Sequence, residues 1–142
     1  MQNRFIQIIK GSALMTETKP KIELDHHLYM SRVLNNALNQ AYFKAAQEVG
    51  LSPVIPKQAG RGSSDFGNIS HIIPGAHVYF SIANKEIPAH SPQFKTAAGS
   101  SYGIAQMFKA SEAMALVGYR FFTDNIFRKE IQNDFAAQKK DL

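Results

Sequence analysis

An α/β fold is predicted by two patterns in the order of apolar and polar residues. Four segments repeat apolar residues every three or four positions, as amphipathic helices do, and two short segments alternate apolar and polar residues, as strands do. At 142 residues, the chain is long enough to bury a core of useful size.

The N-terminal region combines one helix and one strand. Residues 4–15 carry apolar side chains at helical spacing, although no capping residue precedes Phe5. A polar turn follows, and Lys21–Asp25 then alternates polar and apolar residues like a half-buried strand. A helix and an edge strand cannot close a core alone. The helical positions are Phe5, Ile8, Ile9, Ser12 and Ala13.

A long helix is predicted from Met30 to Gly50. Asp25 stands near its start, and Gly50 provides the left-handed residue that ends many helices. The apolar stripe along this segment indicates a core-facing surface rather than a cofactor site. Its members are Met30, Val33, Leu34, Ala37, Leu38, Ala41 and Ala45.

The middle of the chain is predicted to hold a loop, a short helix and the clearest strand. Residues 51–58 form a proline-punctuated extended connection, and residues 59–64 form a loop of small residues. Asp65 can cap a short helix that runs through Ile72. Residues 77–82 are rich in β-branched and aromatic side chains, which is typical of a strand.

The C-terminal half is predicted to be helical. Residues 94–99 form a short turn of helix, and residues 100–123 form a long helix. Asp124 can cap a last helix that continues toward a charged tail. The positions aligned on the long helix are Ile104, Met107, Phe108, Ser111, Met114, Val117 and Phe121.

The composition excludes several classes of protein. The net charge is +5, but lysines and arginines are spread along the chain without interleaved aromatic residues, so we expect no nucleic-acid partner. No stretch approaches the roughly 20 apolar residues that span a bilayer. The absence of cysteine excludes disulfides and thiolate ligands, and it fits a cytoplasmic protein. Any metal ion must therefore be held by His, Asp or Glu.

One of the five histidines stands in an unusual setting. His90 lies just past the predicted strand, in a loop that Pro88 and Pro92 stiffen. Rigid loops after strands often hold ligands or catalytic groups, so His90 is a candidate metal ligand, with an ordinary loop residue as the alternative. We interpret the other four as packed, hydrogen-bonded or solvated. They are His26, His27, His71 and His77.

The glycine-rich stretch Gly60–Gly67 has two open interpretations. It lacks the Lys-Ser/Thr pair of a phosphate-binding loop, and the chain has no catalytic loop that would make its Asp-Phe-Gly a kinase motif. Its backbone amides and hydroxyls could face a small carboxylate or a carbonyl oxygen. Alternatively, it is a plain turn in which Asp65 caps the following helix.

The order of several segments resembles one enzyme family. The segments are Gly62–Ser70 (GSSDFGNIS), Pro74-Gly75, an apolar strand, Ala89–Phe94 (AHSPQF) and a long helix rich in Ala and Met. Together they resemble the C-terminal end of the co-catalytic metal amidohydrolases, peptidase family M-twenty. This family includes aminoacylases, hippuricases, indoleacetyl-amino-acid hydrolases, aminobenzoyl-glutamate hydrolases and Xaa-Arg dipeptidases.

The resemblance implies a metal-dependent hydrolysis. In that family two divalent ions, usually zinc and sometimes manganese, activate a water that attacks an amide carbonyl. His90 matches the family's last metal ligand. Gly62, Ser63 and Ser64 resemble a loop on the family's substrate side. For Asp65 we expect structural support, by hydrogen bonding to the neighbouring groups or as a helix cap.

The same resemblance implies two parts and an incomplete site. Residues 1–25 look like the end of a lid or dimerisation domain, and residues 26–142 look like the C-terminal part of a zinc-peptidase-like catalytic domain. The family's His-x-Asp and Glu-Glu ligand motifs are missing from this sequence. We therefore expect a fragment with no catalytic residue of its own, inactive alone and without tightly bound metal.

These observations lead to two functional hypotheses. In the first, the intact enzyme hydrolyses the amide bond of an N-acyl amino acid or a dipeptide. In the second, the chain is a non-catalytic interaction module, because apolar faces left without cover tend to associate. Both hypotheses are compatible with a homo-oligomer, and neither involves a membrane.

Overall fold

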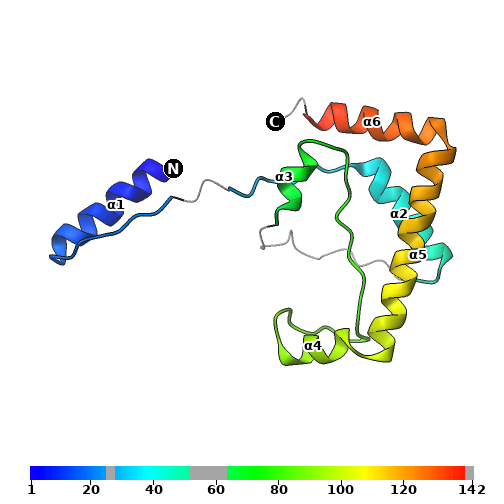
Figure 1. Ribbon diagram of the computed structural model, residues 1–142, viewed down its shortest axis with the longest axis horizontal. Coiled ribbons are helices and arrows are strands. Elements are labelled where there is room, and N and C mark those ends of the chain that lie inside the picture. The colour runs from blue at the N-terminus through cyan, green and yellow to red at the C-terminus, as the bar shows by residue number, and fades with distance from the viewer. Residues whose placement is uncertain (25–27, 52–63, 140–142) are drawn as a thin grey trace.

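The computed structural model describes residues 1–24, 28–51 and 64–139. All regular elements in these ranges are α-helices, and Figure 1 shows their arrangement. None of the described helices is long and apolar enough to cross a lipid bilayer. The helices are α1 (Gln2–Met15), α2 (Asn36–Glu48), α3 (Phe66–Ser70), α4 (Pro92–Ala98), α5 (Ser101–Thr123) and α6 (Asn125–Lys139).

The prediction of an α/β fold is wrong, because the described residues form no sheet. Residues 21–24 and 77–82 were expected to be strands, but neither segment forms one, and within them only Phe80 takes part in an isolated bridge. Val78 and Phe80 instead pack against the cluster of buried side chains between α2 and α5. Alternation of polar and apolar residues shows which side of a segment is buried, and here helices cover that side.

The first helix is confirmed at its predicted place. It spans Gln2–Met15 without a side-chain cap, and it contacts no other helix of the described chain (Figure 1). Phe5 remains 63% exposed, and only Ala13 of this helix is buried. The predicted apolar face of α1 is therefore largely uncovered.

The second helix starts later than the sequence predicts. It begins at Asn36, because the Asn35 side chain accepts a hydrogen bond from the Leu38 amide at 3.0 Å and so caps the first turn. Asn35 also donates to the Ile131 carbonyl oxygen of α6 at 3.0 Å. The Asp134 carboxylate of α6 accepts from the amides of Asn36 and Ala37. The predicted capping residue, Asp25, lies outside the described residues.

Most predicted helix ends agree with the structure. Gly50 follows α2 with φ +68°, in the left-handed region. Asp124 caps α6 by accepting from the amides of Ile126 and Phe127 at 2.9 and 3.0 Å. The helix α3 ends at Ser70, two residues short of the prediction, and α4 starts at Pro92, two residues earlier than predicted.

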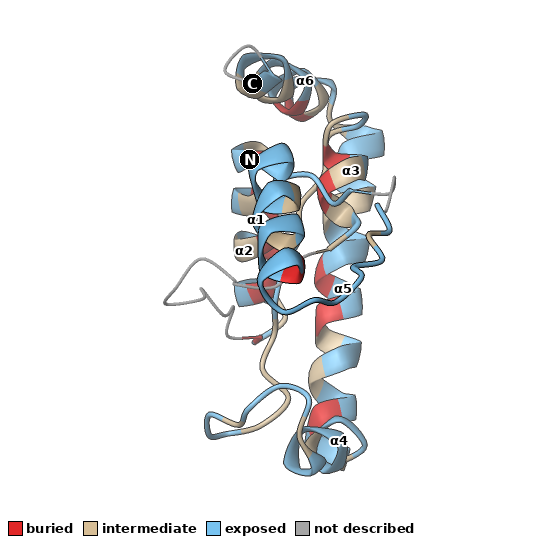
Figure 2. Ribbon diagram, turned by 90° about the vertical axis from the view of Figure 1, so that its left-hand side faces the viewer, coloured by how far each residue is buried: buried red, intermediate tan, exposed pale blue. Residues whose placement is uncertain are grey.

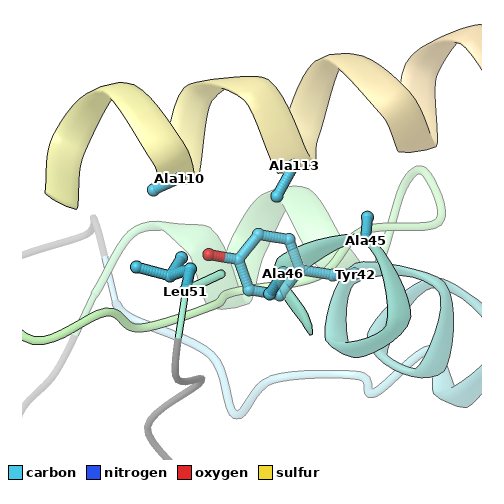
Figure 3. Close-up of a cluster of buried hydrophobic side chains, with 6 residues drawn as sticks. All are labelled: Tyr42, Ala45, Ala46, Leu51, Ala110 and Ala113. Carbon is cyan, nitrogen blue, oxygen red and sulfur yellow. The ribbon is translucent and has the colours of Figure 1, made fainter. Parts of the chain in front are cut away.

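The core lies where α2 meets α5 and α6. Figure 2 shows buried positions on all three helices. Small residues dominate the contact between α2 and α5, and Figure 3 shows Tyr42 lying between them. A second cluster, formed by Ala41, Phe127 and Ile131, joins α2 to α6. The residues of the first cluster are Tyr42, Ala45, Ala46, Leu51, Ala110 and Ala113.

The aligned apolar face of α5 is not the face that is buried. Phe108 is 65% exposed and Met114 is 53% exposed, whereas Ala110 and Ala113 are fully covered. Small side chains let the backbones of α2 and α5 approach closely, so the Ala-rich side of α5 forms the contact. The large apolar side chains of α5 therefore lie on the surface.

Candidate functional site

His90 occupies the turn that leads into α4. The Ser91 hydroxyl donates to the Pro88 carbonyl oxygen at 2.7 Å and accepts from the Phe94 amide at 3.1 Å. Pro92 follows as the first residue of the helix, where its fixed φ angle fits and no amide hydrogen bond is lost. These contacts fix the backbone on the C-terminal side of His90.

The backbone of His90 is strained. Its φ angle is +58°, in the left-handed region that non-glycine residues seldom adopt. That conformation costs roughly 1–2 kcal/mol for an L-residue. Strain of this kind is concentrated at functional sites, so it makes His90 a candidate for function. The residue is also exposed, which leaves its imidazole accessible to a ligand.

A hollow of about 410 Å³ lies beside this turn. It is open to solvent, mostly apolar, and Lys85 is its one charged lining residue. Its volume falls within the range of small-molecule sites. His90 itself does not line it. The lining residues are Ala83, Lys85, Ile87, Pro92, Gln93, Thr96, Ala97 and Ser100.

Only part of the glycine-rich loop can be placed. Gly62 and Ser63 lie outside the described residues. The Ser64 hydroxyl accepts from the Phe66 amide at 3.2 Å and lies 3.4 Å from an Asp65 carboxylate oxygen, to which it donates. Asp65 stands at the position before α3, but its side chain makes no capping hydrogen bond. The hydroxyl of Ser64 thus replaces Asp65 as the local cap.

The described residues do not fit a metal ion. No three His, Asp or Glu side chains in the described part of the chain come close enough to share one. A catalytic zinc needs three protein ligands and an open position, and His90 could supply only one of them. His26 and His27 lie outside the described residues. No reaction step through a metal can therefore be assigned to this chain alone.

Two further histidines have structural partners. His71 Nε2 lies 2.8 Å from the Ser31 carbonyl oxygen, so this nitrogen donates. His77 Nδ1 lies 3.0 Å from Arg32 Nη1, and because a guanidinium only donates, Nδ1 accepts. The neutral His77 ring therefore carries its proton on Nε2. Neither histidine is near a candidate metal group in the described structure.

The surroundings of His77 form a cluster that sequence reasoning did not identify. Its ring stacks on Tyr79 at 4.9 Å between centroids and lies 5.2 Å from Phe66. Arg32 Nη1 also donates to the Tyr79 hydroxyl at 3.4 Å. Partial burial and the Arg32 charge both lower the pKa of His77. His77 and Tyr79 are two residues apart, a spacing that places both side chains on the same side of an extended segment. This spacing is the sequence signal that could have identified the cluster.

The residues after the glycine-rich loop hold a neighbouring segment. Asn68 donates to the Leu28 carbonyl oxygen at 2.9 Å and accepts from the Met30 amide at 3.3 Å. The buried Ser70 hydroxyl accepts from the Val33 amide at 2.9 Å. We call residues 28–33 the strap. Asn68 and Ser70 belong to the GSSDFGNIS motif, so part of that motif has a structural task in this chain.

No protein-family model matches this chain. It is similar to a Xaa-Arg dipeptidase of Mus musculus, with 30% identity over 132 residues. A Xaa-Arg dipeptidase of Homo sapiens is 28% identical over 136 residues. Each match covers 91% of this chain and 30% of the relative, so the chain spans less than a third of the length of these relatives. The similarity thus concerns one part of these dipeptidases.

Proposed function

We propose that this chain forms part of a metal-dependent amidohydrolase or peptidase of the M-twenty family. The observation that carries the proposal is the similarity to Xaa-Arg dipeptidases along 91% of the chain. The proposed substrate is an N-acyl amino acid or a dipeptide, acted on in the cytoplasm by the intact enzyme. The chain alone is inactive, because its described residues supply too few metal ligands.

In this proposal His90 is one ligand of a zinc or manganese ion. Its exposure, its left-handed backbone and the hydrogen bonds of Ser91 support that role. A ligand on a fixed turn stays in place when the ion leaves, which favours rebinding. The other ligands come from outside the described part of the chain.

The glycine-rich loop is proposed to lie on the substrate side. Gly62, Ser63 and Ser64 would offer amides and hydroxyls to the carboxylate or carbonyl oxygen of the substrate. Asp65 would hold the Ser64 hydroxyl, from which it accepts at 3.4 Å. Residues 1–25 would belong to a lid or dimerisation domain and residues 26–142 to the catalytic domain. The lack of contact between α1 and the other described helices supports that division.

A chimera tests this proposal. The chain would replace the matching residues of the Mus musculus Xaa-Arg dipeptidase, and the folded product would be assayed for bound zinc and for dipeptide hydrolysis. We expect both to be present. A folded chimera, verified by circular dichroism and sedimentation, that hydrolyses no dipeptide or N-acyl amino acid would contradict the proposed function.

A pair of variants in the chimera tests the ligand. His90→Ala should lower zinc content and reduce turnover by about a hundredfold or more, because a catalytic zinc site depends on each of its protein ligands. Lys95→Ala is the matched control, since Lys95 is exposed on α4, lies close in sequence and does not line the hollow. Unchanged zinc stoichiometry in His90→Ala would remove His90 from the metal site.

The second candidate function is that of an interaction module. The observation that favours it is the row of large apolar side chains left exposed on α5. Large exposed apolar patches mark sites where proteins associate with partner proteins or with further copies of themselves. In this reading the chain forms a homo-oligomer, and its hydrolase-like segments serve only its fold.

A further inference from the structure

The exposed face of α5 has the spacing of a helix-pairing seam. Six of its residues follow one another at alternating intervals of four and three, which is the a and d pattern of a coiled coil. None is charged, and all are exposed except Gly118, which is half-buried. We call these positions the α5 seam. They are Ile104, Phe108, Ser111, Ala115, Gly118 and Phe122.

The α5 seam has small side chains in its middle and large side chains toward its ends. Ser111, Ala115 and Gly118 are small, and a Cβ added at Gly118 would meet nothing within 4 Å. Phe108 and Phe122, by contrast, are 65% and 78% exposed. A second helix could approach closely at the small residues, with the large rings closing the contact on either side.

The α5 seam complements itself when two copies run antiparallel. In antiparallel pairs an a position faces a d position, which places Phe108 opposite Gly118 and Ser111 opposite Ala115. Each phenylalanine ring of that layer then fills the space above a glycine. A parallel pair would instead stack Phe108 on Phe108 and Gly118 on Gly118, leaving one layer crowded and one empty. A two-fold antiparallel pair is therefore the better fit.

The charged residues of α5 do not oppose this pairing. Lys109, Glu112 and Arg120 all lie off the α5 seam at 100° per residue. Lys109 already donates to the Gly50 carbonyl oxygen at 3.0 Å. Arg120 pairs with Asp124 at 3.4 Å. The apolar face can thus be covered without burying an unpaired charge.

The exposed area of the chain is large enough for such a partner. The accessible surface is 11214 Å², whereas a folded monomer of 15.8 kDa exposes about 7,300 Å². The excess of about 3,900 Å² belongs to the whole chain, including α1, which contacts no other described helix, and it exceeds the roughly 800 Å² that each partner buries in a standard interface. A dimer interface along α5 needs only part of this excess.

We propose that α5 pairs antiparallel with α5 of a second copy of this chain, with Ser111, Ala115 and Gly118 at the crossing point. This pairing rests on the interaction-module function and is independent of the hydrolase function. In the view of Figure 1 α5 forms one edge of the molecule, which agrees with its availability to a second copy.

Light scattering of the complete chain tests the pairing first. We expect a mass of two chains at micromolar concentration. Ala115→Glu should raise the dimer dissociation constant about tenfold or more, because it places a charge at the closest approach of two helices. Ala105→Glu is the matched control, since Ala105 is also exposed on α5 but lies off the α5 seam. It should leave the constant within about twofold.

Cross-linking tests the register, since the chain has no cysteine of its own. Ser111→Cys mixed with Ala115→Cys should give a disulfide-linked mixed dimer, detected by a tag on one variant. Ser111→Cys mixed with Ala105→Cys should give far less. A monomer at all concentrations overturns the proposal, as does association that Ala115→Glu leaves unchanged. Either result leaves the chimera assay of the hydrolase function untouched, so the two proposals fail separately.

Discussion

At the scale of single residues, His90 combines a strained backbone with an exposed side chain. The strain at His90 is caused by its Cβ atom. Glycine has no Cβ atom, so it adopts the left-handed region without a steric penalty. The Pro-Ala-His-Ser-Pro sequence predicted a stiff loop, and the Ser91 hydroxyl makes hydrogen bonds to Pro88 and Phe94 there. It did not predict a positive φ, since that angle depends on how Ser91 closes the turn onto Pro88.

Glycine should be the better small residue at position 90. We expect His90→Gly to be more stable than His90→Ala by about 1 kcal/mol, because only alanine keeps the left-handed strain. Urea unfolding measures the difference. Ala105→Gly is the opposite control, since glycine inside the helix α5 should cost about 1 kcal/mol. Equal stability of His90→Gly and His90→Ala would contradict the strained backbone.

His77 should make the stability of the chain depend on pH. Its pKa is lower in the folded chain than the ordinary 6.5, so the unfolded chain binds the proton more readily. The free energy of unfolding should hold above about pH 6.5 and decrease as the pH falls from there through the folded pKa. Protonation would also place a cation against Arg32 and remove the acceptor at Nδ1.

Chemical unfolding between pH 5 and pH 8 measures this decrease. His77→Gln should flatten it, because glutamine does not titrate. His71→Gln is the control, since His71 is the neighbouring histidine and its ring contacts the Ser31 carbonyl oxygen rather than Arg32. The groups that face the His77 ring are Arg32, Tyr79 and Phe66, of which only Arg32 carries a charge near neutral pH. An unchanged pH profile in His77→Gln would contradict the assignment.

At the scale of the elements, α5 shows where reading the sequence succeeds and where it stops. Its extent is a local property: a helix was predicted over residues 100–123, and α5 spans Ser101–Thr123. The choice of buried face is not local. α5 offers a large apolar face and a small-residue face, and Ala45 and Ala46 of α2 select the small one. Only the partner helix decides between them.

The start of α2 is missed for the same reason. Its cap is completed by α6, through the Ile131 carbonyl oxygen and the Asp134 carboxylate, and these residues are close to 100 positions away in the sequence. Residues 28–35 carry apolar side chains at helical spacing, yet α3 binds several of them as an extended strap. The hydrogen bonds that Asn68 and Ser70 make with the strap outweigh its helical pattern of apolar residues.

Gly103 should tolerate no larger residue at the start of α5. A Cβ at this position would lie 2.3 Å from the Ala97 carbonyl oxygen of α4. We expect Gly103→Ala to lower the free energy of unfolding by about 2–4 kcal/mol, because backbone on both sides must move. Thermal unfolding followed by circular dichroism measures it.

Gly118 gives the matched comparison in the same helix. Its added Cβ would meet no atom within 4 Å, so Gly118→Ala should stabilise the helix by up to about 1 kcal/mol. The comparison is made below the concentration at which the proposed dimer forms, as checked by light scattering. If Gly103→Ala were as stable as the unchanged chain, the tight contact between α4 and α5 would be disproved.

At the scale of the whole molecule, the main difference from the predicted fold is that residues 1–24, 28–51 and 64–139 form no sheet. Residues 77–82 have the composition of a strand, but a strand forms only when a neighbouring backbone supplies its hydrogen bonds. The described chain supplies helices there instead. The composition of a segment and its alternation of polar and apolar residues do not show whether a neighbouring backbone will pair with it. The helices were therefore predictable from the sequence, and the arrangement of layers was not.

The isolated chain should hold no tightly bound zinc. After dialysis against micromolar zinc, plasma emission spectrometry should find well below one zinc per chain, because His90 lacks nearby ligands among the described residues. His90→Ala should give the same low value. One zinc per chain that disappears in His90→Ala would show that a site is completed locally or between copies.

The cap on α2 also has a consequence for the time course of synthesis. The Asn35 side chain donates to the Ile131 carbonyl oxygen, and the first amides of α2 donate to the Asp134 carboxylate; both acceptors belong to α6. A ribosome delivers residues one after another, so these bonds cannot form until α6 has emerged, close to 100 residues after the start of α2. Such distant contacts give a helical protein a high contact order and slow its folding. A nascent chain that stops before α6 therefore presents α2 with an open N-terminus, and chaperones would meet the protein in that form.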